Sequence, residues 1–138
     1  MDVLICRVQE QQYAFDLAVV ERALLAVATT PLPNAPDFVL GAINVHGSVL
    51  PLVSMRKLLG MQPKEIELED HFILCRAQGK RLALWVDQVK EVRTLSQKEL
   101  APHLLPDMQA VQSVFKDDGH IILLYDLEKL MADQKMLW

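Results

Sequence analysis

The sequence predicts a mainly β fold of two small, similar barrels or curled sheets with short helices. Three observations indicate this: apolar runs of strand length recur, turn signals separate them, and two segments repeat in the same order. Runs this short, rich in branched and aromatic residues, favour strands. The 138 residues suffice for one compact domain, so we expect residues 1–138 to form a single domain.

The predicted strands follow one another as hairpins. Turns are expected after Val8, at His46-Gly47, at Gln78-Gly79 and at Asp118-Gly119, where glycine or polar residues interrupt the apolar runs. In chain order, the predicted strands cover residues 3–8, 13–17, 24–28, 42–45, 48–53, 71–77, 81–89, 110–115 and 120–126.

Helical signals are confined to short segments, mainly residues 54–59, 96–99 and 127–131, and Asp126 stands in the N-capping position before the last. Two prolines predict a surface loop or short helical turn over residues 100–107. The C-terminal Trp138 is expected to dock on the domain or on a partner.

The chain also matches itself. Residues 6–20 resemble 75–89 at an offset of 69, and residues 47–58 resemble 119–130 at an offset of 72. Each half therefore reads as a hairpin followed by a turn, a strand and a short helix. Any two amphipathic hairpins can look alike, but two matches in the same order favour duplication. We expect similar barrel halves at roughly 3–61 and 71–131, each too small to be stable alone, separated by a solvated acidic connection at 62–70.

The composition argues against several classes of protein. The 14 Lys and Arg are scattered and outnumbered by 18 Asp and Glu, which gives a net charge of -4 and no basic field for nucleic acid. Cys6 and Cys75 lie inside apolar runs, so buried reduced thiols are expected. No run approaches the about 20 apolar residues of a membrane span, and no signal peptide is evident. We expect a cytoplasmic protein without direct membrane insertion.

No set of residues has the spacing of a catalytic or metal site. The four histidines do not form HxxxH or HExxH, neither cysteine belongs to a CxxC pair, and the five glycines form no phosphate-binding loop. Asp16, Asp87 and Asp126 could act as acids or bases, although turn or capping roles are the simpler interpretation. The sequence therefore predicts no metal, no cofactor and no enzyme activity.

Residues 34–60 carry a specific pattern, beginning at Asn34-Ala35-Pro36 and continuing through Gly41, Asn44, Gly47 and Pro51 to Gly60. This segment resembles, without a gap, the signature PNAPxxxxGxxNxRGxxxPxxDLRxxLG of CheW-like domains, the coupling proteins of bacterial chemosensory arrays. Residues 86–92 are similar to the family's VDxVxxV, and residues 119–130 to its closing strand and LLDxxKL motif. The resemblance covers about residues 3–131.

This resemblance implies a fold of two SH3-like five-stranded β-barrels with a groove between them. It implies a non-catalytic adaptor that couples the cytoplasmic tip of a methyl-accepting chemoreceptor to the regulatory domain of a CheA-type histidine kinase, in association with membrane-bound receptor arrays. The partner-contact residues carried over by position are Val20, Arg22, Gly41, Val45, His46 and Gly47.

Three positions depart from the family pattern. Arg22 stands where the family commonly has Glu, His46 replaces the Arg of NLRG, and Ser54 replaces the Asp of DLR. Reversing one charge and weakening another changes which partners are accepted. The interpretations left open are a specialised paralogue, such as one serving a pilus pathway, a changed receptor choice, and neutral drift. A rival from another class is a small-molecule sensor or enzyme that uses the groove, with His71 or Asp87 lining a closed cavity.

Overall fold

The computed structural model describes residues 1–101, 110–132 and 134. The predicted loop at 100–107 falls largely outside these residues, and Trp138 entirely so. The described elements are β1 (Asp2–Val8), β2 (Gln11–Asp16), η1 (Leu17–Val19), β3 (Val20–Leu25), β4 (Val39–Val45), β5 (Ser48–Ser54), α1 (Met55–Leu58), β6 (His71–Ala77), β7 (Lys80–Val86), β8 (Gln88–Thr94), η2 (Gln97–Glu99), β9 (Val111–Asp117), β10 (His120–Tyr125) and α2 (Leu127–Ala132).

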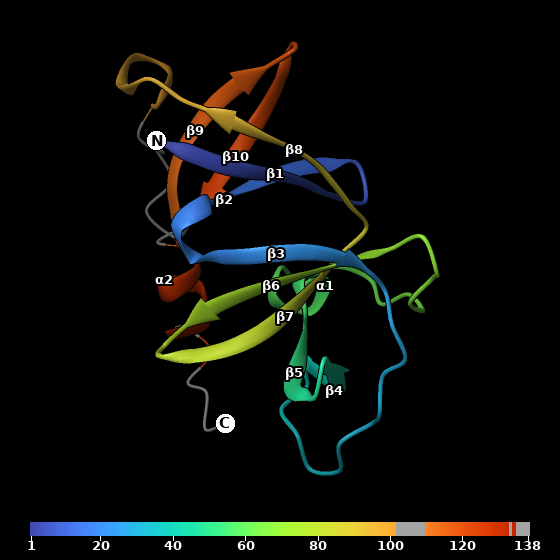
Figure 1. The fold of residues 1–138 in the computed structure, drawn as a ribbon. Helices are drawn as coiled ribbons and strands as arrows, with labels where there is room; N and C mark the ends of the chain where they lie inside the picture. Colours follow the sequence, from blue (N-terminus) through green and yellow to red (C-terminus); the bar gives the residue numbers. More distant parts are fainter. Residues whose placement is uncertain (102–109, 133, 135–138) are drawn as a thin grey trace.

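The strands form two five-stranded sheets that lie one above the other in Figure 1. Sheet A has the order β8-β1-β2-β10-β9, and sheet B has the order β3-β6-β7-β5-β4. Each sheet is closed by an antiparallel bridge between its last strand in that order and the segment that follows its first strand: Ala101 with Val114 in sheet A, and Thr30 with Ala42 in sheet B. The predicted fold class, mainly β with two five-stranded barrels and short helices, is confirmed.

The two halves of the sequence are not the two barrels. Sheet A takes β1 and β2 from the first half and β8, β9 and β10 from the second, and sheet B takes the complementary set. The expected barrel halves at 3–61 and 71–131 are therefore wrong as spatial units. A hairpin from each half pairs in parallel with a hairpin from the other, through β2 with β10 and β5 with β7, so the halves are interleaved.

The internal repeat nevertheless survives in the strand registers. Cys6 pairs with Val89 and Cys75 with Val20, which are equivalent pairs at the offset of 69. Both strand pairs contain a register shift at the same place, since the pairing skips Glu21 in one and Lys90 in the other. Exchanging the two halves of the chain therefore maps sheet A onto sheet B.

Three clusters of buried side chains explain which strands are apolar throughout. The largest contains residues of both sheets and of both short helices and lies between the sheets, whereas the other two fill the interiors of sheets B and A. Strands β1, β2, β6 and β7 supply side chains to an interior and to the layer between the sheets, so both of their faces are largely buried. Cys6 and Cys75 belong to the central layer, and burial raises the pKa of the Cys6 thiol to about 12.

The edge strands β3 and β8 differ from the sequence prediction. Residues 24–28 were expected to form a strand, but β3 begins at Val20 and ends at Leu25. The single strand expected at 81–89 is divided at Asp87, where the chain passes from β7 of sheet B to β8 of sheet A. Both edge strands are largely exposed, and charged residues interrupt their apolar residues, so the continuous apolar pattern that marks the central strands is missing.

The short helices and hairpin turns follow local sequence signals. The Ser54 hydroxyl accepts a hydrogen bond from the Lys57 amide at 3.2 Å, and the Asp126 carboxylate accepts one from the Lys129 amide at 3.2 Å. Residues 97–99 form a 3-10 helix with a capping box. All four predicted turns are present between paired strands. Among the residues that the structure describes, no helix is long and apolar enough to cross a membrane.

The acidic connection is less solvated than its composition suggested. Asp70 is buried, and its carboxylate accepts hydrogen bonds from the Trp85 indole at 3.0 Å and from the Glu67 amide at 2.9 Å. Lys64 lies 3.3 Å from the same carboxylate. The end of the connection is thus fixed onto sheet B, while Glu65, Glu67 and Glu69 remain exposed.

Candidate functional site

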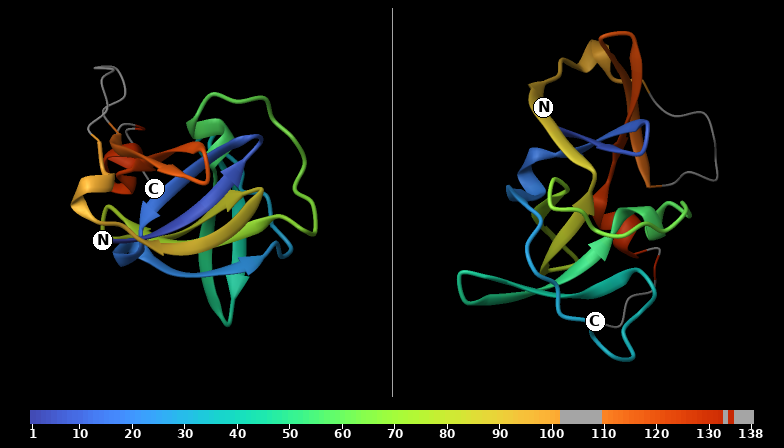
Figure 2. Two further views of the ribbon diagram at one scale, coloured as in Figure 1. Left: turned by 90° about the horizontal axis from the view of Figure 1, so that it is seen from above. Right: turned by 90° about the vertical axis from the view of Figure 1, so that its right-hand side faces the viewer.

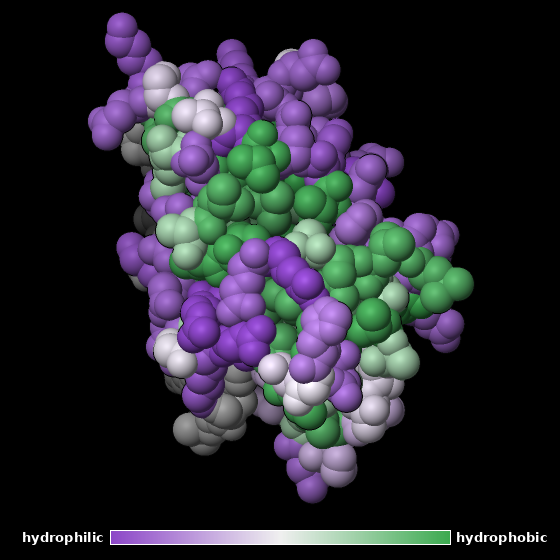
Figure 3. Space-filling model, in the orientation of Figure 1, coloured by the Kyte–Doolittle hydropathy of each residue, from purple (hydrophilic) through white to green (hydrophobic). Residues whose placement is uncertain are grey.

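The two exposed edge strands, β3 and β8, run across one face of the molecule (Figure 1). Between and along them lies an apolar strip, which we define by Val20, Ala23 and Leu25 of β3 and by Val89 and Val92 of β8. Val20 and Val89 pack against the central cluster, whereas Leu25 and Val92 are 58% and 54% exposed. The strip is visible in Figure 3 as hydrophobic surface bordered by hydrophilic side chains. It exists because edge strands leave one side without a neighbouring strand.

Charged side chains of β3, β6 and β7 lie beside the strip and form what we call the β3 rim: Glu21, Arg22, Arg76 and Arg81. Both Glu21 carboxylate oxygens accept hydrogen bonds from Arg81 at 2.9 Å, and Arg76 lies 3.4 Å away. The hydrogen bonds from Arg81, followed by the charges of the neighbouring arginines, lower the pKa of Glu21. Arg22 is exposed, and no ion pair involves it in the described part of the chain.

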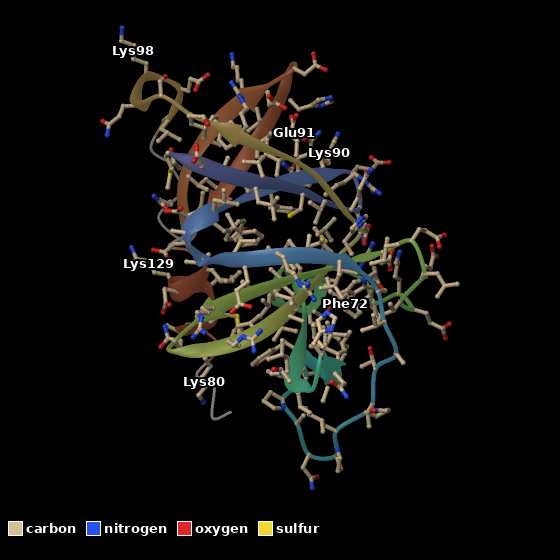
Figure 4. All side chains as sticks on the ribbon, in the orientation of Figure 1. Phe72, Lys80, Lys90, Glu91, Lys98 and Lys129 are labelled. Atoms are coloured by element: carbon tan, nitrogen blue, oxygen red, sulfur yellow. The ribbon has the colours of Figure 1, made fainter. Side chains whose placement is uncertain are left out.

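The equivalent positions beside β8 carry Lys90 and Glu91, which we call the β8 rim. Both side chains are exposed on β8, as Figure 4 shows. Within the described ranges, neither takes part in an ion pair. Neither residue is among the contact residues predicted from the sequence, although the repeat that matches Val20 with Val89 points to both positions.

His46 and Gly47 form the two-residue turn of the β4–β5 hairpin, with φ angles of 49° and 85°. Both lie in the left-handed region, as a hairpin turn that matches the strand twist requires. The Asn44 side chain accepts a hydrogen bond from the Gly47 amide at 2.9 Å, which fixes the turn. His46 is exposed at the tip of a hairpin that projects from the body of sheet B (Figure 2).

Gly41 and Val45 are buried on β4. A Cβ atom at Gly41 would lie 2.3 Å from the carbonyl oxygen of Thr30, the residue whose bridge to Ala42 closes sheet B. The glycine is therefore explained by the close approach of two backbone segments. Any effect of Gly41 on a partner must act through the shape of the β4–β5 hairpin.

The six predicted contact residues thus divide into two groups. Val20 and Arg22 lie on β3, at one edge of sheet B, whereas Gly41, Val45, His46 and Gly47 lie on β4 and its turn, at the other edge. The segment that follows β3 pairs with β4 at the bridge between Thr30 and Ala42. That bridge places the two groups on adjoining parts of one closed sheet.

Asp87 has a structural environment. Its Oδ2 atom lies 2.7 Å from a terminal nitrogen of Arg56 and accepts a hydrogen bond from the Gln9 amide at 2.8 Å. Arg56 is itself buried and stands over the Trp85 ring. The carboxylate that the sensor or enzyme hypothesis would use therefore joins α1 to the β1–β2 turn. No cluster of three metal-ligating side chains occurs in the part of the chain that the structure describes.

Comparisons with known proteins agree with this architecture. Residues 2–135 match the family model described as the CheW-like domain. The chain is 27% identical over 140 residues to the chemotaxis protein CheW of Rhizobium meliloti (strain 1021), with 97% of this chain and 89% of the relative covered. It is 28% identical over 134 residues to the chemotaxis protein CheW of Thermotoga maritima (strain ATCC 43589 / DSM 3109 / JCM 10099 / NBRC 100826 / MSB8), with coverage of 96% and 88%.

A solved structure shows the same fold. The crystal structure of the scaffolding protein TtCheW from Thermoanaerobacter tengcongensis superimposes with a TM-score of 0.83 and 24% sequence identity, covering 94% of this chain and 90% of that one. The family model spans both sheets and nearly all of the described chain. The chain therefore belongs to the CheW-like domain family, as a divergent member.

Proposed function

We propose that this protein is a non-catalytic adaptor of bacterial chemosensory signalling, which couples the cytoplasmic tip of a methyl-accepting chemoreceptor to the regulatory domain of a CheA-type histidine kinase. Membership of the CheW-like family supports this proposal, as do relatives named chemotaxis protein CheW and a fold neighbour named a scaffolding protein. The protein would act in the cytoplasm beside membrane-bound receptor arrays.

The observation that carries the proposal is the apolar strip between two unpaired strand edges. A helical hairpin laid against the strip would cover Leu25 and Val92, two large side chains that are more than half exposed. Single exposed aliphatic residues need no explanation, but these lie beside Val20 and Val89, which continue inward to the central core. The strip therefore combines an apolar centre with charged residues at its margins, as protein–protein interfaces commonly do.

The projecting β4–β5 hairpin offers a second contact surface on the same sheet. His46 at its tip and the exposed Val49 beside it are available to a partner barrel. We propose that Arg22 and His46, which depart from the family pattern, tune which receptor or kinase is accepted, as in a pathway with dedicated partners. Modest contacts at two surfaces gain strength by multivalency in an array.

The proposal is tested by calorimetry with the receptor-tip fragment and the kinase regulatory domain from the same genome. We expect Val92→Ser to weaken receptor binding roughly tenfold, or about 1.4 kcal/mol, because serine removes apolar area from the contact and adds a hydroxyl that must be desolvated. The matched control is Ile121→Ser on β10, a 60% exposed aliphatic residue outside the strip, which should leave the affinity unchanged. Failure of the unaltered protein to bind either partner at about 50 μM would contradict the proposal, because even weak functional interfaces lie near this range.

A further inference from the structure

The apolar strip presents nearly the same backbone surface twice. Exchange of the two halves of the chain maps β3 onto β8, and the strand registers and the position of the skipped residue are the same in both. Val20 corresponds to Val89, Ala23 to Val92, and Leu25 to Thr94. A partner laid across the strip therefore meets a similar backbone surface in two opposite orientations, with an apolar residue of the strip replaced by a polar one only at the pair of Leu25 and Thr94.

The charges beside the strip do not follow this symmetry. Glu21 corresponds to Lys90, and Arg22 corresponds to Glu91, so the sign is reversed at both positions. Figure 4 places Lys90 and Glu91 together on β8, and both are exposed. These charges, together with the replacement of Leu25 by Thr94, are the differences that a partner would encounter in the two orientations.

A difference in net charge appears when the neighbouring strands are included, because the charges of Glu21 and Arg22 sum to zero, as do those of Lys90 and Glu91. On the β3 rim, three arginines surround the single carboxylate of Glu21, which leaves an excess of two positive charges. On the β8 rim, Lys90 and Glu91 cancel, and counting the equivalent residue of the neighbouring strand, Arg7, leaves at most one positive charge. The counterpart of Arg76 is Arg7, which donates to the Gln9 carbonyl and lies 3.8 Å from Asp87. The counterpart of Arg81 is the neutral Gln12.

We propose that this asymmetry fixes the orientation of the bound receptor tip, with its carboxylate-bearing side against the β3 rim. The proposal rests on the proposed function and deepens it by naming the charge of the partner surface. Charged rims act through partner selection and encounter, and they reject the orientation that brings like charges together. Arg22 and Arg76 are the specificity-determining residues, because their charges are the least neutralised on the β3 rim. Arg22 has no ion pair in the described chain, and Arg76 lies 3.4 Å from Glu21, farther than Arg81 at 2.9 Å.

A double exchange tests the orientation without changing the composition. Arg22→Glu combined with Glu91→Arg cancels the positive excess beside β3 and creates an excess of two positive charges beside β8, while the net charge of the protein stays the same. The matched control exchanges charges that belong to neither rim, through Lys98→Glu combined with Glu10→Lys, two exposed positions. Thermal melting of each variant checks that the fold is retained.

The probe is the receptor-tip fragment from the same genome, carrying one nitroxide label on its carboxylate-rich side, added to the isotope-labelled protein. With the unaltered protein and the control, we expect the nitroxide to broaden the NMR amide signals of residues 20–25 and to leave those of 88–94 sharp. With the double exchange, the broadening should move to residues 88–94. Because charge contacts are screened within about 8 Å at physiological salt, the preference should shrink as salt is raised.

Two outcomes separate the two proposals. If the unaltered protein binds no receptor fragment, the proposed function fails. The orientation proposal is overturned, while the proposed function stands, by either of two results. One is broadening that stays at residues 20–25 after the double exchange, and the other is broadening of residues 88–94 in the unaltered protein.

Discussion

Asp87 is the residue at which the chain leaves sheet B and enters sheet A, and its side chain joins parts of both. Its carboxylate binds the buried Arg56 of α1 and the amide of Gln9 in the β1–β2 turn. The counterpart of Gln9 is Gln78, whose amide donates to the Glu128 carboxylate at 2.9 Å. Glu128 in turn occupies the position equivalent to Arg56. The two equivalent hairpin turns are therefore each fixed by a carboxylate, Asp87 for the β1–β2 turn and Glu128 for the β6–β7 turn, and these carboxylates do not stand at equivalent positions.

Removing the Asp87 carboxylate should be costly, because Arg56 would remain buried without its partner. We expect Asp87→Ala to lower the free energy of unfolding by about 3 to 5 kcal/mol. The control is Asp37→Ala, which removes an exposed ion pair with Lys57 at 3.4 Å and should cost no more than about 1 kcal/mol. Urea unfolding followed by circular dichroism measures both. Equal effects would show that Asp87 contributes no more than a surface pair.

At the level of elements, the edge strands combine two tasks. β3 and β8 each pair on one side only, which leaves the apolar strip open, and the segments after them close the sheets. Closure of sheet B in turn requires glycine at position 41, because the Thr30 carbonyl occupies the space that a Cβ atom would need. Gly41, a residue of the family signature, is thus required by the close approach of two backbone segments.

Gly41 and Gly47 can be distinguished experimentally. Gly41→Ala should lower the free energy of unfolding by about 1 to 3 kcal/mol or more, because the backbone must move to avoid Thr30. At Gly47 there is open space, so alanine there costs about 1 to 2 kcal/mol through the left-handed φ of 85° alone. The clearer difference is in amide exchange, where Gly41→Ala should expose the Ala42 amide that bonds Thr30. Unchanged protection of Ala42 would contradict this role for Gly41.

The whole molecule is an interleaved pair. Each sheet needs strands from both halves of the chain, and the largest buried cluster lies between the sheets. Neither half contains a complete sheet, so neither can bury a core by itself. The arrangement resembles two similar chains that have exchanged strands and been joined end to end.

Division of the chain within the connection tests this arrangement. We expect fragments 1–64 and 65–138 to be unfolded separately and to form a β-rich complex when mixed, because every sheet would again have its full set of strands. Circular dichroism and size-exclusion chromatography measure the result. A fragment that folds alone and cooperatively would show that the halves are independent after all. The intact protein in the same buffer is the reference for the spectrum.

Much of the local structure was predictable because its causes are local. The turns at residues 46–47 and 118–119, the Asp126 cap and the burial of both cysteines follow from residue type and apolar pattern. The ends of β3 and the division at Asp87 were missed, because exposed edge strands carry mixed polar residues and no periodic signal. In the candidate site, Val20, Arg22 and His46 were selected from the sequence, whereas Lys90 and Glu91 were not.

The mainly β class follows from the apolar runs and turns, the family from the signature at residues 34–60, and a duplication is favoured by the two repeated segments. The exchange of strands between the halves is visible in the folded molecule alone, because pairing between distant segments depends on which strand edges meet, and a repeat is compatible with either pairing. The exchange brings β3 and β8 onto one face with matched registers, and the charges at the equivalent positions 21 and 90, and 22 and 91, have opposite signs. Contacts between residues far apart in the chain, such as Arg56 with Asp87, then fix how the two sheets are joined.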